Sequence, residues 1–324
     1  AYEIRNCDWS SDVCSSDLAV NGGVSVVGSN NTEVALDIEL AVAMAPGLSK
    51  IYVYEAPNGT AWSTILSRIA NDNQAQQISC SWAGGSPSPS AEQALIQMAT
   101  QGQTYFNSSG DQDSYVGATN FPGFPTDSTN FTVVGGTVLT TSGSTYQSET
   151  VWNDRTVNPN GGNWGSSGGI SPNYAIPTYQ QGVSMSGNQG STTARNLPDV
   201  ALTAKNIWVV FNNGSSGAVG GTSCAAPLWA GFMALVNQQA VQGFSAVLPG
   251  PRPGTFRVMP DNGFGTQANS PDAVLRVYTV EPDFRRWNGR SVAGTGAVRP
   301  VDVDSGRCLA SFSARSHITL ADPL

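Results

Sequence analysis

Histidine and charged residues are scarce in this sequence. It contains one histidine, His317, and only 12% of its 324 residues are charged. The 23 acidic residues outnumber the 15 basic ones, which gives a formal net charge of -8. Nucleic acids and anionic membranes bind basic patches, so we exclude both as partners. No apolar run reaches the roughly 18 residues of a transmembrane helix, and no signal peptide is visible.

The cysteines do not form a recognisable framework. Their number is odd and none has metal-ligand spacing, so we expect buried or free thiols at positions 7, 14, 80, 224 and 308. A chain with few Lys and Glu also has few charge pairs that acid could break. That composition suits a secreted protein that works at low pH.

Hydrophobic residues make up 40% of the chain, enough for a sizeable core. Apolar periodicity predicts helices over residues 31–45, 60–72, 90–101 and 223–238, and strands over 50–55, 77–82 and 206–212. Strands that alternate with helices predict an α/β fold with a mainly parallel central sheet. Residues 140–195 are rich in Gly, Ser, Asn and Thr, and we expect long surface loops there.

Both ends of the chain differ from its middle. Residues 1–18 resemble translated adapter read-through or a disordered arm, and we exclude them from the fold. The last 74 residues hold nine of the 13 arginines, which favours a frameshifted product over a small separate domain for residues 243–324. The predicted catalytic domain is therefore 19–242, and we expect both ends to pack poorly.

The strongest motif is a run of small residues around Ser223, Gly220-Gly221-Thr222-Ser223-Cys224-Ala225-Ala226-Pro227. It follows a strand and a Gly-rich stretch and opens a predicted helix. A serine at a helix N-terminus points outward, and the main-chain N–H groups there can stabilise an oxyanion. Ser223 is therefore a candidate nucleophile, and its alternative role is that of a simple N-cap.

A serine nucleophile needs a base. A Ser-His-Asp enzyme would have to recruit His317 from the arginine-rich tail, so carboxylates are better candidates. Glu33 and Asp37 are four residues apart on one helix face. Two like charges so close raise one pKa and can share a proton, and such a pair can accept a serine proton in acid. The alternative is an ordinary solvated pair of acids.

A third carboxyl follows a predicted strand in Ser109-Gly110-Asp111. Parallel α/β sheets place their sites at strand C-termini. A protonated Asp111 could donate a hydrogen bond to an oxyanion. A turn aspartate is the alternative role, and Asp113 competes for the same function.

These motifs, in this order, resemble those of the sedolisin (serine-carboxyl) peptidases. The resemblance covers about residues 20–242 and includes Ser79-Cys80-Ser81-Trp82, Val134-Gly135-Gly136-Thr137 and Pro198-Asp199-Val200. It implies a subtilisin-like fold and endopeptidase activity at acid pH. By similarity Glu33 is the general base, Asp37 orients it, Ser223 is the nucleophile and Asp111 completes the oxyanion hole.

The resemblance also implies a secreted, monomeric enzyme that acts on polypeptides, is made with a removable pro-segment and holds Ca²⁺. We identify no calcium ligands: Asp302-Val303-Asp304 and Asp261-Asn262-Gly263 lack suitable neighbours, and we expect no complete calcium cage. The metal site is therefore unknown. Two alternatives are a non-catalytic secreted binding module and an inactive fragment of a peptidase. Convergence of the three acids on Ser223 would distinguish a catalytic site from a binding module.

Overall fold

A computed structural model of the chain describes residues 14–23, 31–115, 119, 121–160, 162–185, 187–211, 214–246, 277–280 and 298–301. The helices there are α1 (Asn31–Met44), α2 (Trp62–Asp72), α3 (Pro89–Thr100) and α4 (Thr222–Ala246), with a 3-10 turn η1 (Thr178–Gln180). They agree with the four predicted helices apart from their ends. None of the helices in the described ranges is both long and apolar enough to cross a bilayer.

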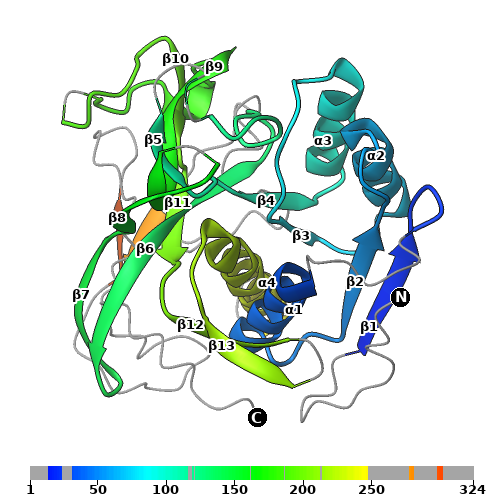
Figure 1. The fold of residues 1–324 in the computed structure, drawn as a ribbon. Helices are drawn as coiled ribbons and strands as arrows, with labels where there is room; N and C mark the ends of the chain where they lie inside the picture. Colours follow the sequence, from blue (N-terminus) through cyan, green and yellow to red (C-terminus); the bar gives the residue numbers. More distant parts are fainter. Residues whose placement is uncertain are drawn as a thin grey trace.

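The central sheet has the predicted parallel character. Its strands lie in the order β11 (Val200–Thr203), β6 (Thr132–Ser142), β4 (Thr104–Ser108), β3 (Gln77–Cys80), and all neighbours on this path are parallel. Strand β7 (Thr145–Val151) continues from β6 as an antiparallel partner. All five residues of β4 are buried, as expected for an inner strand covered on both faces. Figure 1 shows α2 and α3 on one side of this sheet and α1 and α4 on the other.

The segment 140–195 is not the set of surface loops that its composition predicts. Besides the end of β6 and all of β7 it contains β8 (Asn153–Val157), β9 (Asn163–Ala175) and β10 (Ala194–Leu197). Strand β9 pairs with β8, with β10 and with β5 (Gln112–Tyr115). Its buried positions include Ser167 and Ser171 instead of apolar residues. Without apolar alternation these strands give no periodic signal.

Two shorter pairings complete the body of the fold. Strand β12 (Ile207–Phe211), predicted as a strand over 206–212, forms a hairpin with β13 (Ser215–Val219), which lies in the Gly-rich stretch before Ser223. Strand β1 (Cys14–Ala19) lies parallel to β2 (Lys50–Glu55). The structure thus places the end of the excluded 1–18 segment in a strand, and residues 1–13 lie outside the described residues.

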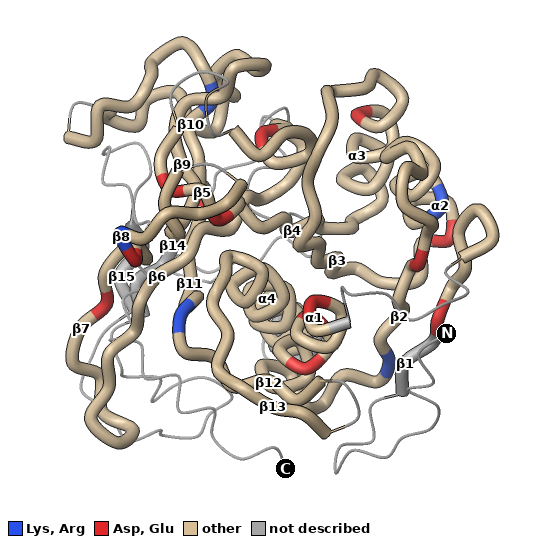
Figure 2. The backbone as a smooth tube through the Cα atoms, in the orientation of Figure 1, with Lys and Arg blue, Asp and Glu red and all other residues tan. Residues whose placement is uncertain are grey.

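The first four residues of the predicted tail end helix α4, and beyond them the structure describes only β14 (Val277–Val280) and β15 (Val298–Val301), which pair with each other. The predicted domain boundaries therefore stay a prediction. Most positions along the described backbone are uncharged, and acidic positions lie on α1 among others (Figure 2).

A buried ion pair fastens the edge of the central sheet. The Arg195 guanidinium, with no exposed surface, donates to Asp199 Oδ2 at 2.7 Å. The same carboxyl accepts the Val133 main-chain N–H at 2.8 Å. Asp199 of the Pro-Asp-Val motif therefore supports the sheet and lies in a structural network.

Helices α1 and α4 pack closely because a glycine lies between them. A Cβ on Gly231 would lie 2.9 Å from Met44 Cβ and 3.0 Å from the Ala41 carbonyl oxygen. Below them Leu36, Leu40, Cys224 and Leu228 form one buried cluster with Val209. This contact fixes the start of α1, with Glu33, against the start of α4, with Ser223.

Gly231→Val should therefore separate the two helices. We expect it to lower the free energy of unfolding by about 1–3 kcal/mol, because the added methyls overpack a closed contact. Chemical denaturation measures this effect. The matched control is Gly217→Val on β13, where a Cβ would meet nothing within 4 Å. Equal stabilities of the two variants would contradict this account of the packing.

Candidate active site

The four predicted site residues lie at one edge of the central sheet. Glu33 and Asp37 come from the first two turns of α1, and Ser223 is the second residue of α4. Asp111 follows β4, at the same carboxyl edge where Ser81 follows β3. Parallel strands end at the same edge, so the fold gathers side chains that are far apart in the sequence.

Glu33 and Asp37, here called the acid pair, lie behind the nucleophile. The Glu33 carboxyl adjoins Ser223, and burial raises its pKa while hydrogen bonding from the Ser223 hydroxyl lowers it. The charge of Asp111 raises the Glu33 pKa again, and Ser81 lowers it. Glu33 Oε1 is buried and has no partner at standard hydrogen-bond geometry within the described ranges. Glu33 Oε1 is therefore available to accept a proton.

Ser81 holds the second member of the acid pair, Asp37, in place. The Ser81 hydroxyl donates to Asp37 Oδ1 at 2.6 Å and lies 3.4 Å from the Ser223 main-chain oxygen. Burial raises the Asp37 pKa well above its usual range, the charge of Glu33 raises it further, and Ser81 lowers it. Two buried carboxyls this close do not both ionise readily, so the acid pair holds a proton in acid.

Asp111 is anchored to the start of α4. Its Oδ1 accepts from the Thr222 main-chain N–H at 2.8 Å and from the Thr222 hydroxyl at 2.9 Å. Burial raises the pKa of Asp111, and these two hydrogen bonds lower it. Asp111 Oδ2 takes part in no hydrogen bond with the described residues, and a Cβ on Gly221 would lie only 3.0 Å from it. Glycine at 221 thus leaves room for this oxygen.

Asp113, the predicted competitor of Asp111, lies elsewhere. It accepts a hydrogen bond from Asn153 Nδ2 at 2.8 Å, and it does not line the pocket beside Ser223. Its main chain has a φ of 63°, a left-handed conformation that Asp adopts more readily than most residues. The structure therefore favours Asp111 for the position across from the nucleophile.

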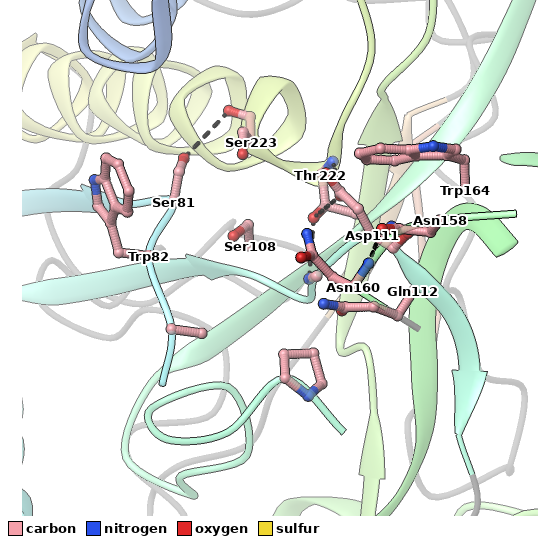
Figure 3. Close-up of a pocket in the computed structure, with 13 residues that line it drawn as sticks. Ser81, Trp82, Ser108, Asp111, Gln112, Asn158, Asn160, Trp164, Thr222 and Ser223 are labelled. Carbon is pink, nitrogen blue, oxygen red and sulfur yellow. Dashed lines mark hydrogen bonds between the residues drawn. The ribbon is translucent and has the colours of Figure 1, made fainter. Parts of the chain in front are cut away.

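A pocket of about 280 Å³ opens in front of Ser223. This Ser223 pocket is lined by Ser81, Trp82, Ala83, Ser108, Gly110, Asp111, Gln112, Pro122, Asn158, Asn160, Trp164, Thr222 and Ser223. Figure 3 shows Trp82 on the side of β3 and Trp164 on the side of β9, with Ser223 and Asp111 between them. A chain segment laid between the tryptophans would pass both the serine and the free Asp111 oxygen.

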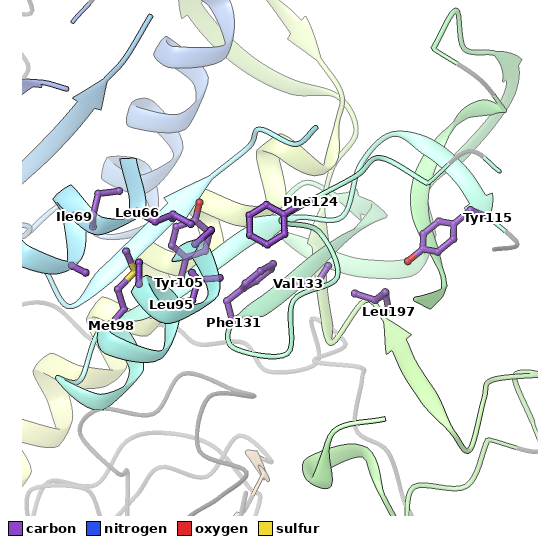
Figure 4. Close-up of a cluster of buried hydrophobic side chains, with 13 residues drawn as sticks. Leu66, Ile69, Leu95, Met98, Tyr105, Tyr115, Phe124, Phe131, Val133 and Leu197 are labelled. Carbon is purple, nitrogen blue, oxygen red and sulfur yellow. The ribbon is translucent and has the colours of Figure 1, made fainter. Parts of the chain in front are cut away.

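The hydrophobic core supports the wall that carries Ser81. Tyr105, buried in the largest core cluster (Figure 4), hydrogen-bonds to the Cys80 thiol of the neighbouring strand. Burial raises the pKa of Cys80 to about 11, so the thiol stays neutral. Cys80 and Cys224 are both free thiols, as expected from the sequence.

Comparison with known proteins identifies sequence relatives of this chain. The chain is 35% identical to kumamolisin of Bacillus sp. (strain MN-32) in a 223-residue alignment that covers 64% of this chain and 39% of that protein. It is 32% identical to xanthomonalisin of Xanthomonas sp. (strain T-22) in a 277-residue alignment that covers 68% of this chain and 33% of that protein. No protein-family model matches.

A solved structure of Pseudomonas sedolisin, described as a serine-carboxyl proteinase in complex with pseudo-iodotyrostatin, has the same fold. Its TM-score is 0.57 at 25% identity, over 70% of this chain and 68% of that one. The chain is therefore similar to the sedolisin family over about two thirds of its length. The predicted resemblance and the subtilisin-like α/β fold class are thus confirmed. The chain spans 33–39% of the length of these two curated sedolisin-family relatives.

Several residues of the Ser223 pocket were not assigned to the site from the sequence. Ser81 and Thr222 were part of the quoted motifs but had no role, although each contacts a predicted catalytic carboxyl. Asn158, Asn160 and Trp164 lie in the segment predicted to be loops. Their spacing is that of a turn, and only the strand pairing around them brings them to the pocket.

The calcium expected of the family has no support yet in this chain. Asp261 and Asp304, which mark the two segments considered for it, lie outside the described residues, and so does His317. In the ranges that the structure describes, no group of three or more His, Cys, Asp or Glu could hold a metal ion. Calcium therefore stays a prediction, and no step proposed below involves it.

Proposed function

We propose that the chain is a serine-type endopeptidase that hydrolyses peptide bonds in acid through Ser223, Glu33 and Asp37, with Asp111 in the oxyanion hole. One observation carries the proposal: Ser223 adjoins the buried Glu33 carboxyl on one side and faces the pocket that Asp111 lines on the other. A binding module has no need to bury two acids behind a serine. The convergence therefore favours a peptidase over the non-catalytic alternative.

In the proposed reaction, Glu33 takes the Ser223 hydroxyl proton as Oγ bonds to the scissile carbonyl carbon. The carbonyl π electrons move to its oxygen, which accepts a hydrogen bond from protonated Asp111 Oδ2. When this intermediate collapses, the carbon–nitrogen bond breaks and Glu33 returns its proton to the leaving amine. Water then attacks the acyl-serine with Glu33 again as base. This step releases the N-terminal peptide fragment with a free carboxyl group and restores Ser223.

The acid pair and Asp111 together set the pH range. Glu33 must be ionised to act as base while Asp37 keeps the shared proton, and Asp111 must be neutral to donate. Burial raises the pKa of all three carboxyls. Asp111 therefore keeps its proton to a higher pH than a free aspartate does, and loses it as the pH rises through that raised value.

The expected biology follows from the same site and composition. We propose polypeptides as substrates and a monomer secreted from a precursor with a removable pro-segment. We propose neither nucleic acid nor membrane as partners, because the chain has a net charge of -8. A secreted, acid-acting enzyme also fits its low content of charge pairs.

A pH–rate profile on an internally quenched peptide tests the proposal. We expect kcat/KM of the full chain to be highest in acid and to fall before neutrality, because ionised Asp111 can no longer donate. His317→Ala should leave the profile unchanged. A rate that rises through pH 7, or a large loss in His317→Ala, would restore a histidine mechanism.

A further inference from the structure

We propose that Asn158 is a positioning residue of the reaction, because its side-chain amide fixes the main chain of Asp111. The inference rests on the proposed function and adds a residue to it. Asn158 lies in the turn between β8 and β9, and only 2% of it is exposed. It lines the Ser223 pocket together with Asp111.

The contact is a direct hydrogen bond. Asn158 Nδ2 donates to the Asp111 main-chain oxygen at 2.7 Å, as Figure 3 shows. The same oxygen also accepts the Gly165 main-chain N–H, at 3.3 Å. The Asn158 bond is the shorter of the two and the one made by a side chain. It therefore holds the Asp111 carbonyl most firmly.

Asp111 is thus held at two points by two different parts of the fold. Thr222 at the start of α4 binds its carboxyl Oδ1, and Asn158 binds its main chain. With both points fixed, the unbonded Oδ2 has a set direction into the pocket. A group that stabilises an oxyanion must be pre-positioned, and a displacement of about 1 Å can cost about 10²-fold in rate.

The second polar atom of the Asn158 side chain is also in use. Its Oδ1 accepts the Asn160 main-chain N–H at 2.9 Å, while its own main-chain N–H donates to the Gly162 oxygen at 3.1 Å. The buried side chain must donate on one side and accept on the other. An amide does so at every pH, whereas a carboxyl of the same shape does so only when protonated.

This difference gives a test on the full chain with Asn158→Asp and Asn158→Leu. In strong acid the introduced carboxyl is protonated and can make both bonds, so kcat should be close to that of the wild type. As the pH rises through its pKa it loses its donor, and kcat should fall up to about 10²-fold relative to the wild type. Asn158→Leu should lose a similar factor at every pH, with KM nearly unchanged in both variants.

Asn153→Asp is the matched control. Asn153 also accepts an N–H from the residue two positions on, that of Arg155 at 2.8 Å, and also donates to an aspartate, but that aspartate is Asp113 outside the pocket. Its kcat relative to the wild type should stay constant across the acid range. Thermal melts at each pH show whether any loss comes from unfolding.

The outcomes separate the two proposals. If the wild type hydrolyses peptides in acid and both Asn158 variants keep its kcat at all pH values, the inference is wrong and the proposed function stands. A loss confined to KM, or one that matches a loss of folded protein, also contradicts a positioning role. If the wild type hydrolyses no peptide in acid, the proposed function fails and takes this inference with it.

Discussion

Ser223→Ala should abolish peptide hydrolysis. Without the hydroxyl no acyl-enzyme forms, and the acid pair has no proton to accept. We expect kcat to fall by about 10⁶-fold, the scale on which serine peptidases lose rate without their nucleophile. Single-turnover assays with an internally quenched peptide measure the loss. Peptide affinity of the folded variant should change little, because the substituted atom is the attacking group.

Ser63→Ala provides the control for this experiment. Ser63 is the second residue of α2, as Ser223 is of α4, and it is not part of the Ser223 pocket. It should keep wild-type activity. If Ser223→Ala keeps more than about one hundredth of the wild-type kcat, Ser223 is not the nucleophile and has only a structural place in the first turn of α4.

The sequence predicts the helices and the parallel character of the central sheet, because these signals are local, but β6 and β11 are not among the predicted strands. Strand β4 begins with the β-branched and aromatic residues Thr104, Tyr105 and Phe106, and helices α2 and α3 have apolar faces. Glu33 and Asp37 are four residues apart, so the helix alone places them on one face. Which helix lies opposite them depends on the close contact at Gly231, which no local pattern encodes.

The second sheet could not be predicted in the same way. Strand β9 is rich in Gly, Ser and Asn, and its pairing depends on main-chain hydrogen bonds and on close approaches such as Gly169 to Tyr115. A Cβ at Gly169 would lie 2.5 Å from the Tyr115 main-chain oxygen. Asn158 therefore looks like a turn residue until strands β5, β8 and β9 are paired.

The acid pair also explains why a low content of histidine was the most informative compositional feature. A buried carboxyl beside a second one can have its pKa raised into the range where it exchanges a proton in acid, which the histidine imidazole does near neutrality. In the structure the causes are visible: burial of both groups, their mutual charge and hydrogen bonds from Ser223 and Ser81. The surroundings of Glu33 thus raise its pKa into the range that a general base needs in acid.

Glu33→Gln should be the second most damaging substitution. The amide has nearly the shape of the carboxyl and can still contact Ser223, but it cannot take up the serine proton. General-base catalysis is worth about 10²–10⁴-fold, and we expect kcat to fall by at least about 10³-fold. The loss should persist at every pH, because a raised pH does not turn an amide into a base.

Glu39→Gln is the matched control on the same helix. Burial raises the pKa of Glu39 too, and its carboxyl accepts the Val210 main-chain N–H at 3.0 Å, away from the Ser223 pocket. An amide oxygen can accept the same bond, so activity should stay near that of the wild type. If Glu33→Gln and Glu39→Gln lose equal activity, Glu33 is not the base. If the Glu33→Gln loss disappears as the pH rises, a group of higher pKa takes the proton, and the acid-pair mechanism is wrong.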